Sequence, residues 1–229
     1  FAVPGSELFR VLTVSSLTLA DIGIAWCFTR LIGGIAGWLF LLNPISMIIS
    51  GFHLQFDNIT LMLGCGAILL TTKSGATRRS DAWGDVLLGT SLVTKHLLVV
   101  LPLWSIVRPD RSRGRIWYLT PVLIFGASFV PWALSAAGRD GIIQDVLMFR
   151  SGREVALLGR FGESVEENLR WLSGLYGTIT LLALVGVGWL VRHHDVVTAF
   201  FTYVLAAFAF SPGLSNQQLV VLLLALIGL

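Results

Sequence analysis

The chain has 229 residues, of which 55% are hydrophobic and 13% are charged, and its mean hydropathy is +0.81. Soluble domains carry roughly 25% charged residues, so this composition excludes a disordered segment, a nucleic-acid-binding domain and a small disulfide-stabilised module. The net charge is +3, and the basic residues gather in short clusters between apolar segments, as they do in the cytoplasmic loops of membrane proteins. The sequence therefore predicts an all-α, polytopic membrane helix bundle.

Eight apolar runs are candidate spanning helices, each of which needs roughly 20 residues, or fewer if it is short or broken. Cys27 and Cys65 lie inside two of these runs without metal-ligand or redox spacing, so we expect them to be core residues. Gly33 and Gly37 form a small-xxx-small pair that favours close helix packing. The runs are Leu8–Phe28, Leu31–Ser50, Ile59–Thr72, Val86–Val107, Ile116–Ala137, Leu175–Val191, Val196–Phe210 and Leu219–Leu229.

The two ends of the chain lie close to apolar runs. The first residue is Phe1, and no charged segment with a cleavage site precedes the first run, while the last run is still apolar at Leu229. We therefore interpret residues 1–229 as a single transmembrane domain that is part of a longer protein.

Three basic clusters separate the runs, at Lys73–Arg79, Arg108–Arg115 and Arg192–His194. The positive-inside rule places all three in the cytoplasm. Only Val86–Val107 lies between the first two clusters, and one crossing would put those clusters on opposite sides of the membrane. His193 and His194 fit a solvated turn better than a metal site.

The run Val86–Val107 has the features of a broken helix. Lys95 lies near its centre and Pro102 follows. An intramembrane lysine faces protein or a water-filled cavity, and a proline removes a helical hydrogen bond. We predict two half-helices that rise to a polar cavity and return to the cytoplasmic side. This topology places three polar segments on the extracytosolic face, namely His53–Asn58, Gly138–Ser173 and Ser211–Gln218.

The first polar segment follows Asn43-Pro44, which we expect to end a helix. His53, Gln55 and Asp57 then alternate with apolar residues at a membrane boundary. Their imidazole, amide and carboxylate groups can bind the hydroxyls of a sugar or a phosphate, and Asp57 can bind a cation. The alternative is a polar helix cap with interfacial aromatic residues.

Lys95 and His96 form the second polar feature. A cation in a low-dielectric cavity suits a lipid phosphate or pyrophosphate, because the attraction is poorly screened there. The alternative is an internal ion pair, with Asp21 of the first run as the candidate partner.

The remaining two polar segments are loops. Gly138–Ser173 is rich in arginine, and Arg150, Arg153 or Arg160 can hold a phosphate bidentately, whereas the alternative is charge solvated at the headgroup layer. In Ser211–Gln218, a turn between two runs, Asn216 and Gln217 offer donors and acceptors.

The order of these pieces resembles the lipid-linked-oligosaccharide glucosyltransferases, which are multi-pass GT-C enzymes that use dolichyl-phosphate-glucose, and their bacterial relatives. In this sequence Asp57 stands where the family has asparagine, and His96 where it has glutamine. The donor sugar and acceptor therefore stay open, and the chain resembles bacterial polyprenyl-phosphate-sugar transferases of the same superfamily equally well. The matching segments are Asn43-Pro44, His53-x-Gln55-Phe56-Asp57, Thr94-Lys95-His96 with Pro102, Leu8-Phe9-Arg10 through Asp21, Gln144–Arg160 and Phe210–Gln218.

The resemblance implies a GT-C-like hexosyltransferase that moves a hexose, with inversion, from a polyprenyl-phosphate donor to a lipid-linked or other extracytosolic acceptor. It implies no cofactor and no metal, and its partners are donor, acceptor and membrane lipid, without nucleic acid. It further implies a multi-pass protein of a bacterial plasma membrane or the endoplasmic reticulum. The implied substrate-binding residues are His53, Gln55, Asp57, Lys95, Arg150, Arg153, Asn216 and Gln217.

In this family the catalytic carboxylate lies on a first luminal loop, which would precede Phe1 together with the first helix. We therefore expect a chain that lacks both and nominate no catalytic residue in it. The alternative function is a transporter or flippase for a lipid-linked or small anionic substrate.

Overall fold

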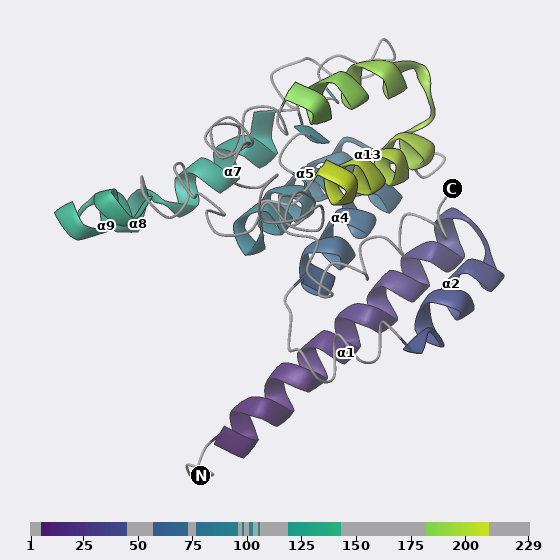
Figure 1. Ribbon diagram of the computed structural model, residues 1–229, viewed down its shortest axis with the longest axis horizontal. Helices are drawn as coiled ribbons and strands as arrows, with labels where there is room; N and C mark the ends of the chain where they lie inside the picture. Colours follow the sequence, from purple (N-terminus) through teal and green to yellow (C-terminus); the bar gives the residue numbers. More distant parts are fainter. Residues whose placement is uncertain are drawn as a thin grey trace, which may run out of the picture.

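A computed structural model describes residues 6–44, 57–72, 77–95, 98, 101–102, 105, 119–142 and 182–210. Every regular element within these ranges is a helix (Figure 1), which confirms the all-α prediction for the described part of the chain. The elements are α1 (Ser6–Leu31), α2 (Gly34–Leu41), α4 (Asp57–Thr72), α5 (Arg78–Thr94), α7 (Thr120–Ser128), α8 (Val130–Ala133), α9 (Ala136–Gly141), the helix Leu182–His193 with its 3-10 end η4 (Val191–His193), and α13 (Val196–Phe210).

The helices α1 and α2 form a tight hairpin. Gly33 makes the turn with φ of +149°, a conformation that side-chain-bearing residues rarely adopt. At Gly37, an added Cβ would overlap Thr29 Oγ1 and lie 2.6 Å from the carbonyl oxygen of Ala25. The backbones therefore approach closely at Gly37, as the small-xxx-small pair predicts, while Gly33 serves the turn.

The helices α4 and α5 form a second, antiparallel hairpin. Thr77 caps α5 by accepting a hydrogen bond from the backbone of Ser80, and the Ser80 side chain accepts one from the backbone of Thr77. This capping box starts α5 at Arg78, eight residues before the apolar run Val86–Val107. Hydropathy alone cannot find such a start, because exposed arginine and aspartate are compatible with a helix.

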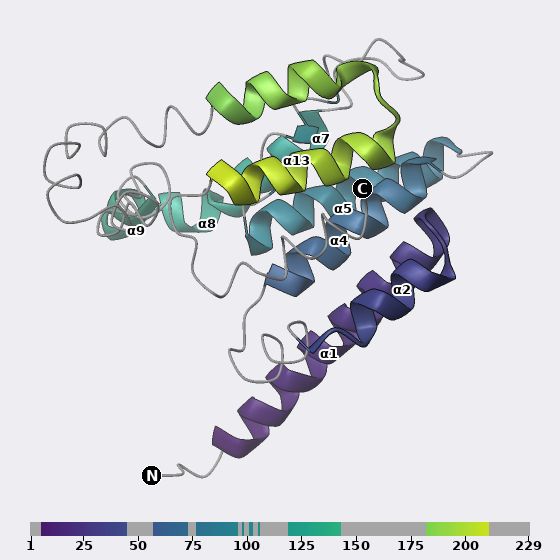
Figure 2. The same cartoon turned by 45° about the vertical axis from the view of Figure 1, so that its right-hand side comes forward.

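Contacts along α1 and α4 show that these two helices run in the same direction. Asp21 meets Asn58, and a Cβ on Gly23 would lie 2.6 Å from Met62 Sδ. The first half of α1 extends beyond the start of α4 and projects from the bundle, as Figures 1 and 2 show.

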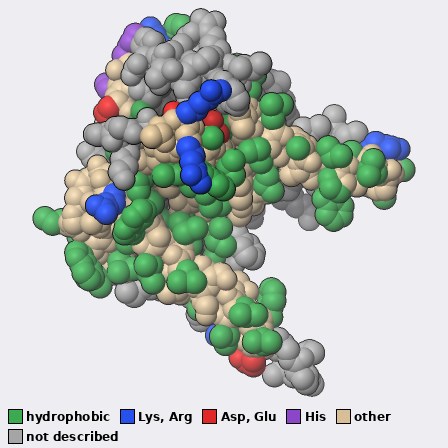
Figure 3. Space-filling view, turned by 180° about the vertical axis from the view of Figure 1, so that it is seen from behind, with side chains coloured by type: hydrophobic (Ala, Val, Ile, Leu, Met, Phe, Trp, Pro, Cys, Tyr) green, Lys and Arg blue, Asp and Glu red, His purple; other side chains and the backbone are tan. Residues whose placement is uncertain are grey.

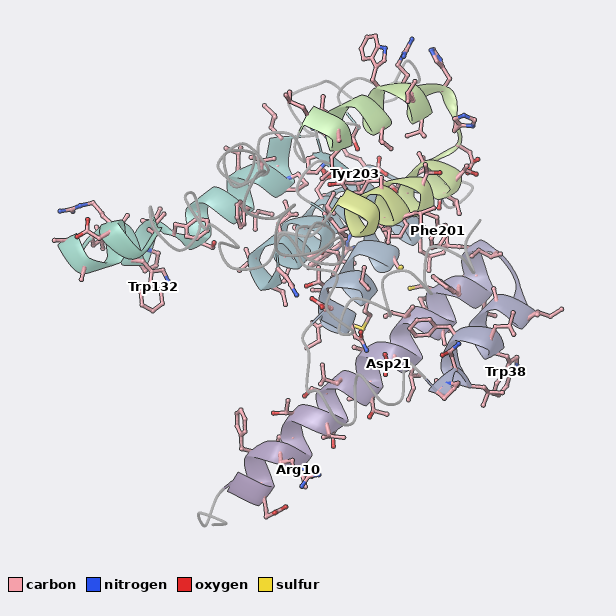
Figure 4. All side chains as sticks on the ribbon, in the orientation of Figure 1. Arg10, Asp21, Trp38, Trp132, Phe201 and Tyr203 are labelled. Atoms are coloured by element: carbon pink, nitrogen blue, oxygen red, sulfur yellow. The ribbon has the colours of Figure 1, made fainter. Side chains whose placement is uncertain are left out.

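The core is built around a chain of edge-to-face aromatic contacts. Phe28 of α1 contacts Phe40 of α2 at 5.6 Å and Phe201 of α13 at 5.3 Å between ring centroids, and Phe201 also contacts Phe200 at 5.3 Å. All four rings are fully buried, and Figure 4 shows Phe201 directed into the bundle. Cys27 and Cys65 are buried free thiols in the same core, which confirms the prediction for both.

Two of the predicted runs correspond to observed helices almost residue for residue. The run Val196–Phe210 has the bounds of α13, and Ile59–Thr72 differs from α4 only by two residues at its start. Asp195 caps α13 by accepting hydrogen bonds from the backbone N–H groups of Val197 and Thr198, both at 3.0 Å. The two hydrogen bonds from Thr198 lower the pKa of this exposed carboxyl, and the bond from its side chain has the larger effect.

Two other runs are interrupted. In place of one helix over Ile116–Ala137, the structure has α7, α8 and α9. Pro131 separates α7 from α8, because it cannot donate a backbone hydrogen bond and its ring excludes a continuous helix, and Ser135 begins α9 by accepting a hydrogen bond from the backbone of Gly138. The prediction of one continuous span there was wrong. In Leu31–Ser50, α2 ends at Leu41, just before Asn43-Pro44, as expected for that motif, and its eight residues rise only about 12 Å.

One described helix, Glu7–Leu31, is long and apolar enough to cross a membrane by length and composition. A membrane span and a signal sequence near the N-terminus both meet this test of length and composition. Asp57–Thr72, Leu182–His193 and Val196–Ala206 are shorter apolar helices within the described ranges. The run Leu219–Leu229 lies outside the described residues.

The close approach at Gly37 predicts that Gly37→Ala destabilises the α1–α2 hairpin. The new methyl group must push apart Thr29 and the α1 backbone, so we expect the free energy of unfolding to fall by about 1–3 kcal/mol. Thermal unfolding in detergent with a thiol-reactive dye measures this, because Cys27 and Cys65 are buried and react only on unfolding. Gly34→Ala is the control, since an added Cβ there meets nothing within 4 Å. Equal Tm values for the two variants would contradict the prediction.

Candidate functional site

A group of polar side chains lies where α1, α4 and α5 meet, and we call it the polar cluster. Apart from Lys95, its members are at least nine-tenths buried, although the surrounding helices are apolar. Figure 4 shows the position of Asp21 halfway along α1, at the level where the bundle begins. The cluster consists of Asp21, Asp57, Asn58, Thr60, Ser91 and Lys95.

On the α1 side of the polar cluster, Asn58 Nδ2 donates a hydrogen bond of 2.6 Å to Asp21 Oδ1. Both side chains are buried, so this bond is shielded from water. A buried carboxylate without a partner is strongly destabilising, and a hydrogen bond to a charged group contributes about 1.5–3 kcal/mol. The pair therefore ties the middle of α1 to the start of α4.

On the α5 side, Lys95 Nζ forms an ion pair with Asp57 Oδ1. Lys95 is the residue at which α5 ends, and its extended backbone (φ −160°, ψ 129°) breaks the helix there. The break was predicted within Val86–Val107, and the helix does end at Lys95. The internal ion pair considered for Lys95 is present, but its carboxylate is Asp57 and not Asp21.

The two members of the ion pair differ greatly in exposure. The side chain of Asp57 is 2% exposed, whereas that of Lys95 is 43% exposed. Asp57 Oδ2 and Thr60 Oγ1 are buried and have no hydrogen-bond partner among the residues that the structure describes. The Asp57 carboxylate therefore lies at the inner end of the site, and the partly exposed side chain of Lys95 lies toward its surface.

A further hydrogen bond joins the two helices of the hairpin within the cluster. Ser91 Oγ donates to the carbonyl oxygen of Thr60 at 2.9 Å, and both residues are fully buried. Because this bond lies one turn from Lys95, it fixes the register of α5 against α4 at the ion pair.

Asp57 and Lys95 are the two predicted substrate-binding residues that the structure describes, and it brings them together from separate segments. The other predicted residues lie outside the described residues, as does His96. They are His53, Gln55, Arg150, Arg153, Asn216 and Gln217.

Sequence reasoning missed Asn58, Thr60 and Ser91. Two of them had a spacing signal: Thr60 follows Asp57 by three residues, and Ser91 precedes Lys95 by four, so each pair lies on one helix face. Asn58 is adjacent to Asp57 and points toward a different helix, which spacing alone does not show.

The described residues hold no group of three or more histidine, cysteine, aspartate or glutamate side chains that could bind a metal ion. His193 and His194 are exposed on the turn before α13. A shallow pocket of about 350 Å³ at the α1–α2 turn is lined by Ile32, Gly33, Gly34, Ile35, Ala36 and Leu39 and contains no charged side chain. The polar cluster is therefore the part of the described structure that is best suited to bind a ligand or take part in a reaction.

Comparison of the chain with protein-family models, with curated proteins and with solved structures finds no match in any of the three.

The ion pair predicts strong energetic coupling between Asp57 and Lys95. Removing only the lysine leaves a buried carboxylate unpaired, so we expect Lys95→Met to cost about 1–3 kcal/mol of unfolding free energy. In the Asp57→Asn background the same substitution costs much less, and the difference is a coupling energy of about 0.5–3 kcal/mol. Thermal or denaturant unfolding of the two single variants and the double variant measures it.

The matched control for this cycle pairs Lys95→Met with Asp195→Asn, a carboxylate that caps α13 and lies outside the cluster. Those two effects should add. Additive effects for Asp57 and Lys95 as well would rule out a functional ion pair.

Proposed function

We propose that the chain forms a multi-pass membrane domain. Twenty-four large hydrophobic side chains are exposed in the described part of the chain, and Figure 3 shows them over both projecting arms. Soluble monomers rarely expose contiguous apolar surface above a few hundred Å². Lipid contact accounts for this surface, and buried polar pairs between helices are typical of the interior of membrane bundles.

The basic residues support one orientation of this domain. Arg30 ends α1 and Arg78 begins α5, so both lie at the end of the bundle where the α4–α5 hairpin turns. In Figures 1 and 2 the turn before α13, which carries Arg192, lies toward the same end. By the positive-inside rule this end faces the cytoplasm.

Cysteine labelling tests the predicted return of the broken helix. Ser74→Cys and Ser112→Cys place a thiol in each of the first two basic clusters. If the half-helices return, a membrane-impermeant maleimide should label neither in intact cells and both after permeabilisation. The native thiols give little background because they are buried. Labelling of Ser112→Cys alone in intact cells would mean a single crossing and refute the return.

Within this domain, we propose that the polar cluster binds the phosphate of a polyprenyl-phosphate sugar, and that the whole protein transfers the hexose to an extracytosolic acceptor. The observation that carries the proposal is the asymmetric ion pair. Buried Asp57 holds Lys95 at a helix break, and the Lys95 side chain is 43% exposed. The ammonium group of Lys95 has three donors, so it can donate to the oxygen of a phosphate while it pairs with Asp57.

The first half of α1 supports a lipid-linked substrate. Leu8, Phe9, Val11 and Leu12 are exposed on the part of α1 that projects beyond the polar cluster. This apolar surface lies about 14–20 Å along α1 from Asp21, a distance that suits a long hydrocarbon chain whose phosphate binds in the polar cluster.

The chemistry assigned to this chain is stabilisation of the leaving phosphate. When the bond between the anomeric carbon and the phosphate oxygen breaks, negative charge grows on that oxygen, and Lys95 lowers the energy of this charge. The acceptor hydroxyl supplies the new bond, and its proton leaves to a base that we do not assign to any residue here.

Replacing Lys95 tests the transferase proposal in the purified full-length protein. We expect Lys95→Met to reduce sugar transfer from a polyprenyl-phosphate hexose by about 10²-fold or more, since removing one charge-stabilising group typically has this effect. Lys95→Arg keeps the charge and should retain part of the activity. Lys73→Met is the matched control, because Lys73 is the only other lysine in the chain.

The double variant Lys95→Met with Asp57→Asn separates function from folding. It removes the unpaired carboxylate, so stability should return while transfer stays low. Recovery of transfer in the double variant, or unchanged turnover in Lys95→Met, would reject the assignment.

A transporter or flippase is the second candidate. The observation that favours it is the presence of helix breaks at Lys95 and at Pro131 together with buried carboxylates, which are also found in secondary transporters. Movement of a labelled polyprenyl phosphate across reconstituted vesicles, without sugar transfer, would favour this function over the first.

A further inference from the structure

On three helices, an exposed tryptophan lies one turn from an arginine, on the side toward the middle of the helix. On α1, Arg30 lies over the ring of Trp26, with 5.8 Å from Cζ to the ring centroid. On the helix Leu182–His193, Arg192 stacks on Trp189 at 4.0 Å and donates a hydrogen bond of 2.8 Å to its carbonyl oxygen. On α5, Arg79 and Trp83 are four residues apart and therefore share a helix face.

The three tryptophans are alike in exposure, at 54% for Trp26 and 55% for both Trp83 and Trp189. In each pair the arginine lies toward the end of its helix and the tryptophan toward the middle. This order is what a membrane interface requires, because the indole ring prefers the headgroup level and the guanidinium group the phosphates just outside it.

The three pairs lie toward one end of the bundle. Trp26 and Arg30 are in the last turns of α1, and α1 runs parallel to α4. Trp83 and Arg79 are in the first turns of α5, next to the end of α4, because α4 and α5 are antiparallel. The turn that carries Arg192 lies on the same side as the end of α1 in both Figure 1 and Figure 2.

We propose that these six residues form one interfacial collar, which binds the phosphate headgroups of an anionic lipid surface and sets the depth of the bundle in the membrane. Tryptophan and arginine in the same ring match an anionic leaflet both in polarity and in charge. This proposal rests on the membrane placement proposed above and not on the sugar-transfer activity.

The collar has a consequence for the depth of the polar cluster. Thr94 lies about 17 Å along α5 from Trp83, close to the middle of a hydrocarbon core of about 30 Å. On α1, Glu7 lies about 29 Å from Trp26, so the first charged residue falls near the opposite interface. Counted along α5, the ion pair of Asp57 and Lys95 thus lies about 17 Å inside the collar, whereas Asp21 lies about 8 Å inside it along α1.

Lipid-dependent thermal stability of the full-length protein tests the collar. Purified protein in neutral detergent is unfolded in the presence of phosphatidylglycerol or phosphatidylcholine, with the thiol-reactive dye as reporter. We expect phosphatidylglycerol, but not phosphatidylcholine, to raise the Tm of the wild-type protein by about 5–10 °C. The variant with Arg30→Gln, Arg79→Gln and Arg192→Gln should lose this rise.

The matched control carries Arg10→Gln and Arg139→Gln, two exposed arginines outside the collar, and should keep the rise. An equal rise in all three proteins, or a loss in the control as large as in the collar variant, would overturn the proposal. If the collar variant does not fold, depth-dependent quenching decides. Trp26→Phe, Trp83→Phe and Trp189→Phe together should remove most quenching by lipids brominated near the headgroup. Undiminished quenching would overturn the proposal.

Sugar transfer provides the distinction from the transferase proposal. Absence of the lipid effect in the wild-type protein, or its persistence in the collar variant, with transfer intact, rejects the collar alone. Loss of transfer in Lys95→Met with an intact lipid effect supports the transferase and leaves the collar in place.

Discussion

The arrangement of α1, α4 and α5 depends on the need to pair two carboxylates that are withdrawn from water. Asp21 and Asp57 are buried among apolar helices, where an unpaired charge costs several kcal/mol. Their partners come from other helices, Asn58 for Asp21 and Lys95 for Asp57. Because adjacent residues on a helix point about 100° apart, Asn58 can contact α1 while Asp57 contacts the end of α5. One point on α4 thereby sets the register of both.

Close approach at glycines of α5 packs this helix against α4 and α7. A Cβ on Gly84 would lie 2.8 Å from a methyl group of Thr71, and a Cβ on Gly89 would lie 2.8 Å from Ile124. In a lipid environment, apolar side chains gain little by leaving lipid for protein, so tight van der Waals packing and interhelical hydrogen bonds supply the association energy. Small residues at the contacts and polar pairs in the middle of the bundle therefore both stabilise the association of the helices.

The position of Lys95 links this packing to the proposed chemistry. The helix α5 ends just before the residue that pairs with Asp57, so Lys95 has a buried partner while its own side chain is 43% exposed. A lysine inside a continuous helix would be either covered by neighbours or directed into lipid. At the break, Lys95 has a buried partner that fixes its position and a side chain that is partly exposed, which is the combination that an anion-binding group requires.

The sequence by itself determined the features that depend on local hydropathy and capping. The bounds of α4 and α13, the end of α2 before Asn43-Pro44, the break at Lys95 and the burial of both cysteines all follow from neighbouring residues. Where local signals compete, hydropathy misled: Pro131 divides one apolar run, and the Thr77–Ser80 capping box extends α5 into a charged segment. Only the tertiary structure decided the partner of Lys95. Asp57 lies 38 residues away, and which of the buried carboxylates reaches the lysine depends on how the helices pack. That choice is made by the direction of side chains around each helix, which sequence spacing describes within one helix but not between helices.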